Sequence, residues 1–599
     1  MCGIAAHISF NGSATPLDLR QIHHRGPDSS GEWLSPNELC WLGNTRLAIM
    51  DLSPAGAQPM LDPFTGNVIV VNGEIYNHLE LRRELDAEVP WQGTSDTETL
   101  LRCYARWGHG LLERLKGMFA FVIYDAARDE IFVARDRLGI KPLYCMETPS
   151  GMFFASEARM LVNEPQTVSA SSVSSFLQWG ACPEEDLLFR GVRSFGAGHA
   201  MTIGRDRSVN EWTYWPPPRP IRSPKGDAPA QVRRLLERAV DEHLLADVPV
   251  ASFLSGGIDS SIITAMAAQK LDRKLQTFSV GFESEEFDET SIALQVAQRY
   301  GTEHERIQLS DEEVISSVTE AIAKLDLPSV DAINTYVVSK AVAARGVKVA
   351  LSGLGGDELF GGYATFRDVP RLKLMARLPP SIRGLIGKLA GHQDRLLDLP
   401  ATTETMEMAR WRRRFLTDRQ IASAELPHSL TLPEAAIDLP DDFARISWAE
   451  LSGYMRRMLL RDSDQMSMAV SLELRVPLLD HELVEYVLGL PAVEKQRFAG
   501  TKGLLVEACR DLLPTAVFQR AKRGFVLPMR EWMSGPLAEF VRHGVDQAIV
   551  RGLLPSRFVH EVKAAFEADR LHWTRLWSIV VLGQFAERHH LTSADVSTL

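Results

Sequence analysis

The 599-residue sequence predicts an α+β sandwich followed by a parallel α/β domain whose last part is mainly helical. Two observations carry this prediction. The run Trp215-Pro-Pro-Pro-Arg-Pro220 interrupts the chain, because consecutive prolines fix φ and remove backbone donors. The apolar rhythm also changes across this run. We therefore place one domain at residues 2–214 and a second at residues 225–599. Hydrophobic residues make up 45% of the sequence, which is enough to form a core in each domain.

Short β-rich segments dominate the first domain, and two stretches with apolar residues at helical spacing interrupt them. We expect strands at residues 4–10, 68–71, 118–124, 130–134 and 152–155, and helices at residues 77–85 and 96–107.

Strands and helices alternate in the second domain, which is the pattern of a parallel sheet. We expect strands at residues 248–254, 277–282 and 347–351. Helices are expected at residues 231–245, 260–269, 291–300 and 332–344. From about residue 368 onward the sequence predicts mainly helix.

Charge and hydropathy narrow the class of protein. Lys and Arg number 65 against 77 Asp and Glu, and this net charge of −12 disfavours a nucleic-acid partner. We find neither an apolar run of the ~18 residues that a membrane helix needs nor a secretory signal. The six cysteines show no framework spacing and are typical of reduced thiols. The sequence thus predicts a cytoplasmic enzyme with no membrane partner.

Cys2 directly follows the initiator methionine. Its small side chain allows Met1 to be removed, which leaves a free α-amine on the residue that carries the thiol. Such an amine titrates near ~8 and can serve as the general base for that thiol. A cysteine at position 2 can also be incidental, so the interpretation depends on the neighbouring motifs.

Four motifs accompany Cys2-Gly3-Ile4, and the set resembles the class II glutamine amidotransferases, whose fold is an αββα N-terminal-nucleophile hydrolase sandwich. The motifs are RGPD (25–28), RLAI (46–49), NGEIYN (72–77) and SDTE (95–98). The resemblance implies that Cys2 attacks the glutamine side-chain amide, while Asn72 and Gly73 form the oxyanion hole. It also implies a glutamine-binding set of Arg46, Leu47, Ile49, Asn72, Gly73, Glu74 and Asp96.

Structural interpretations of the neighbouring residues remain open. Asn72-Gly73 is also a common hairpin pair. His23 and His24 are interpreted as packing or loop residues, because the α-amine already provides a base.

A glycine-rich segment, Ser255-Gly-Gly-Ile-Asp-Ser-Ser261, follows the expected strand at residues 248–254 and precedes a helix. Glycines let the backbone approach a phosphate, and the helix N-terminus adds donors and positive potential. A second such segment, Ser352-Gly-Leu-Gly-Gly-Asp357, follows the strand at residues 347–351. The two carboxylates, Asp259 and Asp357, suit Mg²⁺ because this ion prefers oxygen ligands and retained waters.

The first segment, at residues 255–261, resembles the PP-loop of the ATP-pyrophosphatases, which cleave ATP to AMP and pyrophosphate while they activate a carboxyl or carbonyl oxygen of the acceptor. The resemblance implies ATP and Mg²⁺ as cofactors, with the metal on Asp259 and Asp357. It implies that Lys522 stabilises the departing pyrophosphate, although this lysine could also be one charge of a solvated turn. The implied ATP-binding residues are Leu254, Ser255, Gly256, Gly257, Asp259, Ser260, Val280, Ser352 and Gly353.

Both halves in this order resemble the glutamine-hydrolysing asparagine synthetases. The resemblance implies glutamine hydrolysis, internal passage of ammonia, adenylation of a carboxylate and amide formation, with aspartate as the default acceptor. Relatives are often dimeric, so a homodimer is an open expectation. Leu354 departs from the family, which usually has an acidic residue there. Either leucine is tolerated, or the enzyme amidates a different carboxylate on a peptide, sugar acid or secondary metabolite.

Two other functions are less compatible with the sequence. A ring-forming ligase of the β-lactam-synthetase kind needs no glutaminase, whereas Cys2, Arg46, Asn72 and Asp96 are all present. A non-catalytic sensor would not need the intact nucleophile and phosphate loops. The sequence therefore favours a glutamine amidotransferase over both.

Overall fold

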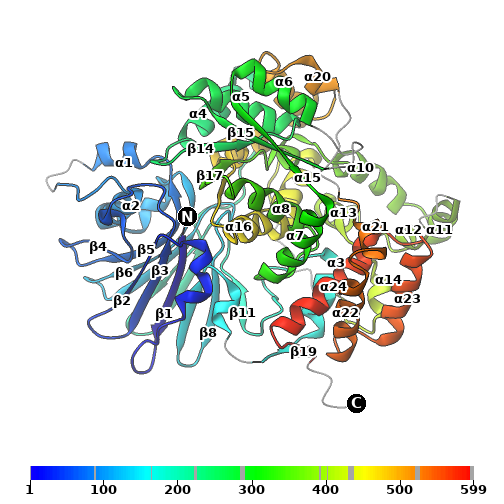
Figure 1. Ribbon diagram of the computed structural model, residues 1–599, viewed down its shortest axis with the longest axis horizontal. Helices are drawn as coiled ribbons and strands as arrows, with labels where there is room; N and C mark the ends of the chain where they lie inside the picture. Colours follow the sequence, from blue (N-terminus) through cyan, green and yellow to red (C-terminus); the bar gives the residue numbers. More distant parts are fainter. Residues whose placement is uncertain are drawn as a thin grey trace.

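Two six-stranded antiparallel sheets pack face to face in the N-terminal part of the computed structural model (Figure 1). The structure describes residues 2–85, 90–162, 165–221, 226–282, 290–389, 393–400, 402–428, 437–498, 500–519 and 527–593. The first sheet has the order β11 (Val192–Ser194), β8 (Tyr144–Thr148), β9 (Gly151–Ala155), β1 (Cys2–Ser9), β3 (Cys40–Arg46) and β2 (Ser29–Leu34). The second has the order β13 (Val209–Thr213), β12 (His199–Ile203), β7 (Glu130–Arg135), β6 (Gly117–Asp125), β5 (Val68–Ile75) and β4 (Met60–Leu61).

An apolar core fills the space between these sheets. Ile4 and Leu42 come from the first sheet and Val70 and Val122 from the second, and all four are fully buried. Helices α1 (His78–Glu84) and α2 (Asp96–Trp107) cover the outer face of the second sheet. The outer face of the first sheet packs on α3 (Ala170–Trp179) and on helices from the far end of the chain. The predicted αββα sandwich is confirmed.

A five-stranded parallel sheet organises the second part of the chain. Its order is β16 (Glu303–Leu309), β15 (Gln276–Phe282), β14 (Val250–Phe253), β17 (Val349–Leu351) and β18 (Glu473–Arg475). The helices near it are α4 (Ala228–His243), α5 (Ile258–Lys270), α6 (Thr290–Tyr300), α7 (Asp311–Lys324), α8 (Ala332–Ala343) and α9 (Gly356–Phe360). The predicted parallel sheet is confirmed, and β18 adds a fifth strand that the apolar pattern did not indicate.

From about residue 368 onward the described chain is mainly helical, as predicted. Its two described strands are β18, which belongs to the parallel sheet, and β19 (Thr592–Ser593), which pairs with β10 (Thr167–Val168) of the N-terminal part. Its helices up to residue 468 are α10 (Thr365–Ala376), α11 (Pro380–Leu389), α12 (Gln393–Leu397), α13 (Thr405–Arg413), α14 (Asp418–Ser423), α15 (Asp442–Glu450), a π-helix (Leu451–Leu460) and α16 (Arg461–Met468). The later ones are α17 (His481–Gly489), α18 (Ala492–Gln496), α19 (Gly503–Cys509), α20 (Thr515–Gln519), α21 (Met529–Ser534), α22 (Ala538–Val550), α23 (Ser556–Glu567) and α24 (Trp573–Arg588). Within the described ranges, no helix is both long enough and apolar enough to cross a membrane.

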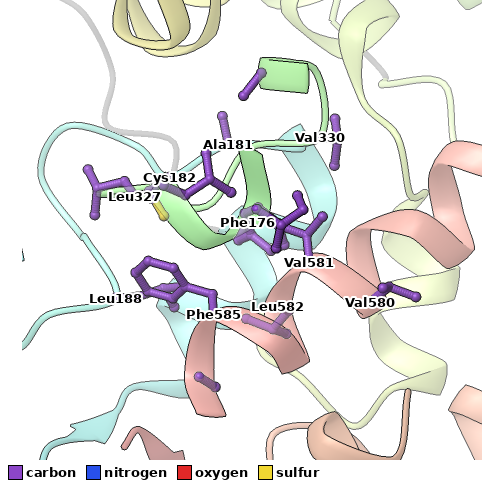
Figure 2. Close-up of a cluster of buried hydrophobic side chains, with 14 of the residues drawn as sticks. Phe176, Ala181, Cys182, Leu188, Leu327, Val330, Val580, Val581, Leu582 and Phe585 are labelled. Atoms are coloured by element: carbon purple, nitrogen blue, oxygen red, sulfur yellow. The ribbon is translucent and has the colours of Figure 1, made fainter. Parts of the chain in front are cut away.

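The two parts of the chain share one hydrophobic core. Figure 2 shows Phe176 of α3 beside Val581 and Phe585 of α24, with Cys182 and Leu327 close by. A core built from both parts fixes their relative position, because separating them would expose this apolar surface to water.

Candidate active sites

Cys2 begins β1, an inner strand of the first sheet, where it pairs with Arg46 of β3. Its side chain is buried, and burial raises the pKa of its thiol. A buried thiol of this kind stays protonated at neutral pH, so attack on a substrate requires a base. The predicted base, the α-amine of Cys2 itself, lies within reach of the thiol by covalent geometry.

Asn72 of β5 faces Cys2. The Cys2 backbone N–H donates to Asn72 Oδ1 over 3.3 Å, and this contact fixes the orientation of the amide. Asn72 Nδ2 is buried, and it has no hydrogen-bond partner within the described chain. Because buried donors in proteins are nearly always paired, this one is suited to a ligand oxygen.

Gly73 adjoins Asn72 and has a φ of 150°. A β-carbon there would lie 2.0 Å from the Met118 carbonyl oxygen on the paired strand β6. The position therefore requires glycine on steric grounds. Asn72-Gly73 lies inside β5 and pairs with Ala120 and Phe119, so it is not a hairpin turn.

Arg46 is buried and supports the loop that follows β3. Its guanidinium donates to the backbone carbonyls of Ser53 and Met50, each over 3.2 Å, and to that of Asp51. Leu47 and Ile49 on the same loop are buried in the core of the second domain. The structure thus brings these three predicted glutamine-binding residues together beside Cys2.

Glu74 and Asp96 belong to a buried acidic cluster at the end of β5. Asp96 Oδ2 accepts from the Ile75 backbone N–H over 2.8 Å. Burial, followed by the neighbouring Glu473 and Asp96 carboxylates, raises the pKa of Glu74. The Arg475 guanidinium lies 3.6 Å from the Glu74 carboxylate. This cluster contains more carboxylates than cations and would favour a bound ammonium group.

Sequence reasoning missed two residues of this site. A hydrogen bond from the Asn44 side chain lowers the pKa of the Cys2 thiol and so opposes the effect of burial. Arg25, in the RGPD motif, is fully buried and approaches the Cys2 carbonyl oxygen with Nε at 3.4 Å. The RGPD motif was a signal for Arg25, whereas Asn44 lies in no recognised motif. His24 contacts Glu157 at 2.8 Å, in accord with a packing role.

The first glycine-rich loop links β14 to α5. The Ser255 and Ser260 hydroxyls lie 2.9 Å apart, and Ser255 N–H donates to Ser260 Oγ over 3.3 Å. Gly256 has a φ of 79°, and Gly257 precedes the 13-residue helix α5 with no side-chain cap. The open N-terminus of α5 therefore points its backbone donors at this loop.

The second loop follows β17, the strand next to β14, and packs directly on the first. A β-carbon at Gly353 would lie 2.7 Å from the Ser260 backbone nitrogen. Ser352 is buried, and its N–H donates to the Arg475 carbonyl oxygen over 2.8 Å. Leu254 directly follows β14 and donates its N–H to the Phe278 carbonyl of β15, and Val280 lies farther along β15. Both loops thus meet at the carboxyl end of the parallel strands, where ligands bind in open α/β sheets.

Asp259 lies in the first turn of α5 and Asp357 in the first turn of α9, and their carboxylates approach the same point. The Lys502 ammonium occupies it, 2.7 Å from Asp357 Oδ1 and in contact with Asp259 Oδ2. Within the described ranges no three His, Cys, Asp or Glu residues form a metal-binding cluster. Two carboxylates still fit Mg²⁺, which usually takes one or two from the protein and its other oxygens from phosphates and water. Lys522 lies outside the described residues.

Buried charges connect the two sites. The Arg25 Nη2 atom donates to Asp464 of α16 over 2.7 Å, and Lys141 lies 3.7 Å from the same carboxylate. Arg475 contacts both Glu74 and Glu473, and its carbonyl oxygen holds Ser352. Because Glu74 lies two residues after Asn72 on β5, its contact with Arg475 links the Cys2 region to Ser352 of the second glycine-rich loop.

Two family models match successive parts of this chain. The family model described as "Asparagine synthase" matches residues 231–590, and "Glutamine amidotransferase domain" matches residues 1–215. Asparagine synthetase [glutamine-hydrolyzing] 1 of Bacillus subtilis is 31% identical, over 97% of this chain and 96% of its own. Asparagine synthetase [glutamine-hydrolyzing] 3 of the same organism is 30% identical, over 87% and 86%. Amidase chry2 of Gibberella zeae is 28% identical, over 92% and 93%.

Proposed function

Because this chain belongs to the asparagine synthase family and carries a glutamine amidotransferase domain, we propose that it makes asparagine from aspartate, with glutamine as nitrogen donor. ATP would be cleaved to AMP and pyrophosphate. The main structural support for glutamine hydrolysis is the contact between Cys2 and Asn72. With its oxygen in this contact, Asn72 keeps its Nδ2 donor buried and without a partner in the described structure.

In the proposed glutaminase step, removal of Met1 frees the Cys2 α-amine, which takes the thiol proton. The thiolate attacks the glutamine amide carbon, and the developing oxyanion accepts hydrogen bonds from Asn72 Nδ2 and the Gly73 N–H. Arg46 would hold the α-carboxylate, and Glu74 and Asp96 the α-ammonium. The α-ammonium returns the thiol proton to the amide nitrogen, which leaves as ammonia, and water then releases glutamate from the thioester and restores the Cys2 thiol.

In the proposed synthetase step, the two glycine-rich loops bind ATP with Ser255, Ser260 and the N-terminus of α5 directed at the phosphates. Asp259 and Asp357 would hold Mg²⁺, which neutralises charge on the phosphates. Lys522 would stabilise the departing pyrophosphate. The acceptor carboxylate attacks the α-phosphorus, and ammonia then displaces AMP to form the amide.

A different acceptor is the second candidate, and Leu354 favours it. Leu354 is half-buried against the apolar core of the second domain, so this position supplies neither charge nor a proton acceptor. A relative named as an amidase is also similar to this chain over most of its length. We therefore propose aspartate as the acceptor, with a different carboxylate as the second candidate.

Replacement of Cys2 tests the amidotransferase proposal. We expect Cys2→Ala to abolish product formation with glutamine, because the nucleophile is lost, and to retain product formation with ammonium chloride. Product formed from glutamine by Cys2→Ala at the wild-type rate would refute it. Cys40→Ala, which removes a buried thiol elsewhere in the sandwich, is the matched control and should leave glutamine use intact.

A further inference from the structure

Helix α11 turns its large aliphatic side chains toward solvent, at the outer right end of the molecule in Figure 1. Four of them recur at helical spacing and therefore share one face, which we call the α11 stripe: Ile382, Leu385, Ile386 and Leu389. Their exposed fractions lie between 36% and 82%. Single exposed aliphatic residues are common on proteins, whereas a continuous apolar surface of this kind is typical of an interaction site.

The opposite side of α11 attaches the helix to the protein. Gly384 and Gly387 are buried there, and a β-carbon at Gly384 would lie 3.1 Å from Leu397 Cδ2 of α12. The Arg383 guanidinium donates to the Leu399 carbonyl oxygen over 2.8 Å. The side that packs on the protein thus carries small residues, and the side that faces water carries the large apolar ones. Packing within this chain leaves the stripe exposed.

Positive charge surrounds the α11 stripe. Residues 369–389 contain five basic residues and no acidic one, in a chain whose net charge is −12. Lys373 pairs with Asp442 at 2.7 Å, and Arg383 is buried. The other three are exposed: Arg371, Arg377 and Lys388. An apolar face with basic residues around it is complementary to a surface that is negative outside and apolar inside.

We propose that the α11 stripe docks this protein on an anionic lipid surface, with its aliphatic side chains among the acyl chains and the basic residues at the headgroups. Leu385 and Leu389 are the most exposed members of the stripe, so they project from the protein surface and a fluid bilayer can cover them without a matching groove. A second copy of this chain is less suitable, because two stripes placed face to face would bring like charges together.

The expectation of no membrane partner depended on the lack of an apolar run long enough to span a bilayer. A helix that lies on a bilayer needs only one apolar face, which enters the boundary between headgroups and acyl chains. The docking does not depend on the proposed amidation, and it concerns a surface that contains none of the proposed catalytic residues.

Co-sedimentation of the full-length protein with lipid vesicles tests this docking. We expect binding to vesicles of equal parts phosphatidylglycerol and phosphatidylcholine, and binding weaker by about tenfold or more to phosphatidylcholine alone. Binding to the anionic vesicles should also weaken as salt is added, because salt screens the attraction between the basic residues and the headgroups.

Variants of the stripe make the test specific. Leu385→Gln combined with Leu389→Gln should weaken binding to the anionic vesicles by roughly tenfold or more, because two apolar side chains are lost from the inserted face. Thermal unfolding checks that this protein folds, as expected for exposed positions. The matched control, Val493→Gln combined with Val550→Gln, changes two comparably exposed aliphatic residues on α18 and α22 and should bind like wild type.

Equal binding by wild type and the doubly substituted Leu385 and Leu389 protein would overturn the proposal, as would equal binding to anionic and neutral vesicles. A wild type that binds no vesicles would overturn it too, and sedimentation velocity would then identify the occupant. A dimer that the two leucine substitutions dissociate would assign the stripe to a second copy, whereas a monomer in both proteins would point to an acidic protein partner. Turnover assays without lipid test the proposed amidation separately.

Discussion

Asn72 makes its proposed contribution to glutamine hydrolysis through one amide nitrogen. Its oxygen is already engaged by the Cys2 N–H, and its nitrogen remains for the oxyanion. A donor that is fixed before the substrate arrives needs no reorganisation during the reaction, which is why such donors contribute strongly to rate.

We expect Asn72→Ala to lower kcat for glutamine hydrolysis by about 10²–10³, with a small change in KM. Glutamate release at saturating glutamine measures this effect. The control is Asn67→Ala, because Asn67 is also buried but accepts from Ala126 at a hairpin. A loss confined to KM would mean that Asn72 binds the ground state only.

At the scale of one strand, β18 shows why a buried charged pair can form part of a sheet. Glu473 and Arg475 are fully buried, and the Arg475 Nε atom donates to Glu473 Oε1 over 2.6 Å. Burial would raise the pKa of Glu473, but the Arg475 guanidinium lowers it to about 2. The carboxylate therefore remains ionised inside the protein.

We expect Glu473→Gln to reduce the free energy of unfolding by roughly 3 kcal/mol at pH 7, because Arg475 loses its nearest partner. The contribution of a carboxyl with a lowered pKa is complete above its unfolded value and is lost as pH falls. The gap between wild type and variant should narrow from about pH 4.5 toward pH 2.

Urea unfolding at a series of pH values measures this gap. Glu507→Gln is the control, because Glu507 pairs with Arg510 on the surface and should contribute less than about 1 kcal/mol. If the difference in free energy of unfolding between wild type and Glu473→Gln did not change with pH, Glu473 would not be stabilised as a carboxylate by Arg475.

The sequence predicted the sheets and helices where apolar periodicity was strong, as at α2, β14 and α5. It did not predict β18, because a three-residue strand with two charges has no apolar pattern. The motif residues Cys2 and Asn72 contact each other in the structure, and Asp259 lies beside the second glycine-rich loop, while their roles stay predictions. The contact between Lys502 and Asp259 was not foreseeable, since 243 positions separate them and only the fold brings them together.

At the scale of the whole molecule, the shared core makes the two parts of the chain dependent on each other. Phe585 of α24 is fully buried, and its ring centroid lies 5.6 Å from that of Phe189 in the N-terminal part. Buried aromatic rings of this kind contribute strongly to stability through their large apolar area.

We expect Phe585→Ala to cost about 3–5 kcal/mol of stability and to lower the unfolding temperature of both parts together. Scanning calorimetry follows the transitions. Val550→Ala on α22 is the control, because that side chain is 77% exposed. A separate transition for the glutaminase part that the variant leaves unchanged would contradict this coupling.

The most direct test of the acceptor measures AMP and pyrophosphate release in the presence of MgATP and glutamine, with and without aspartate. Mass spectrometry identifies the product. If aspartate is the acceptor, AMP release depends on aspartate and one asparagine forms for each AMP. Glutamate release from glutamine without aspartate-dependent AMP would contradict aspartate as the acceptor. It would point instead to a different carboxylate at the loop that contains Leu354.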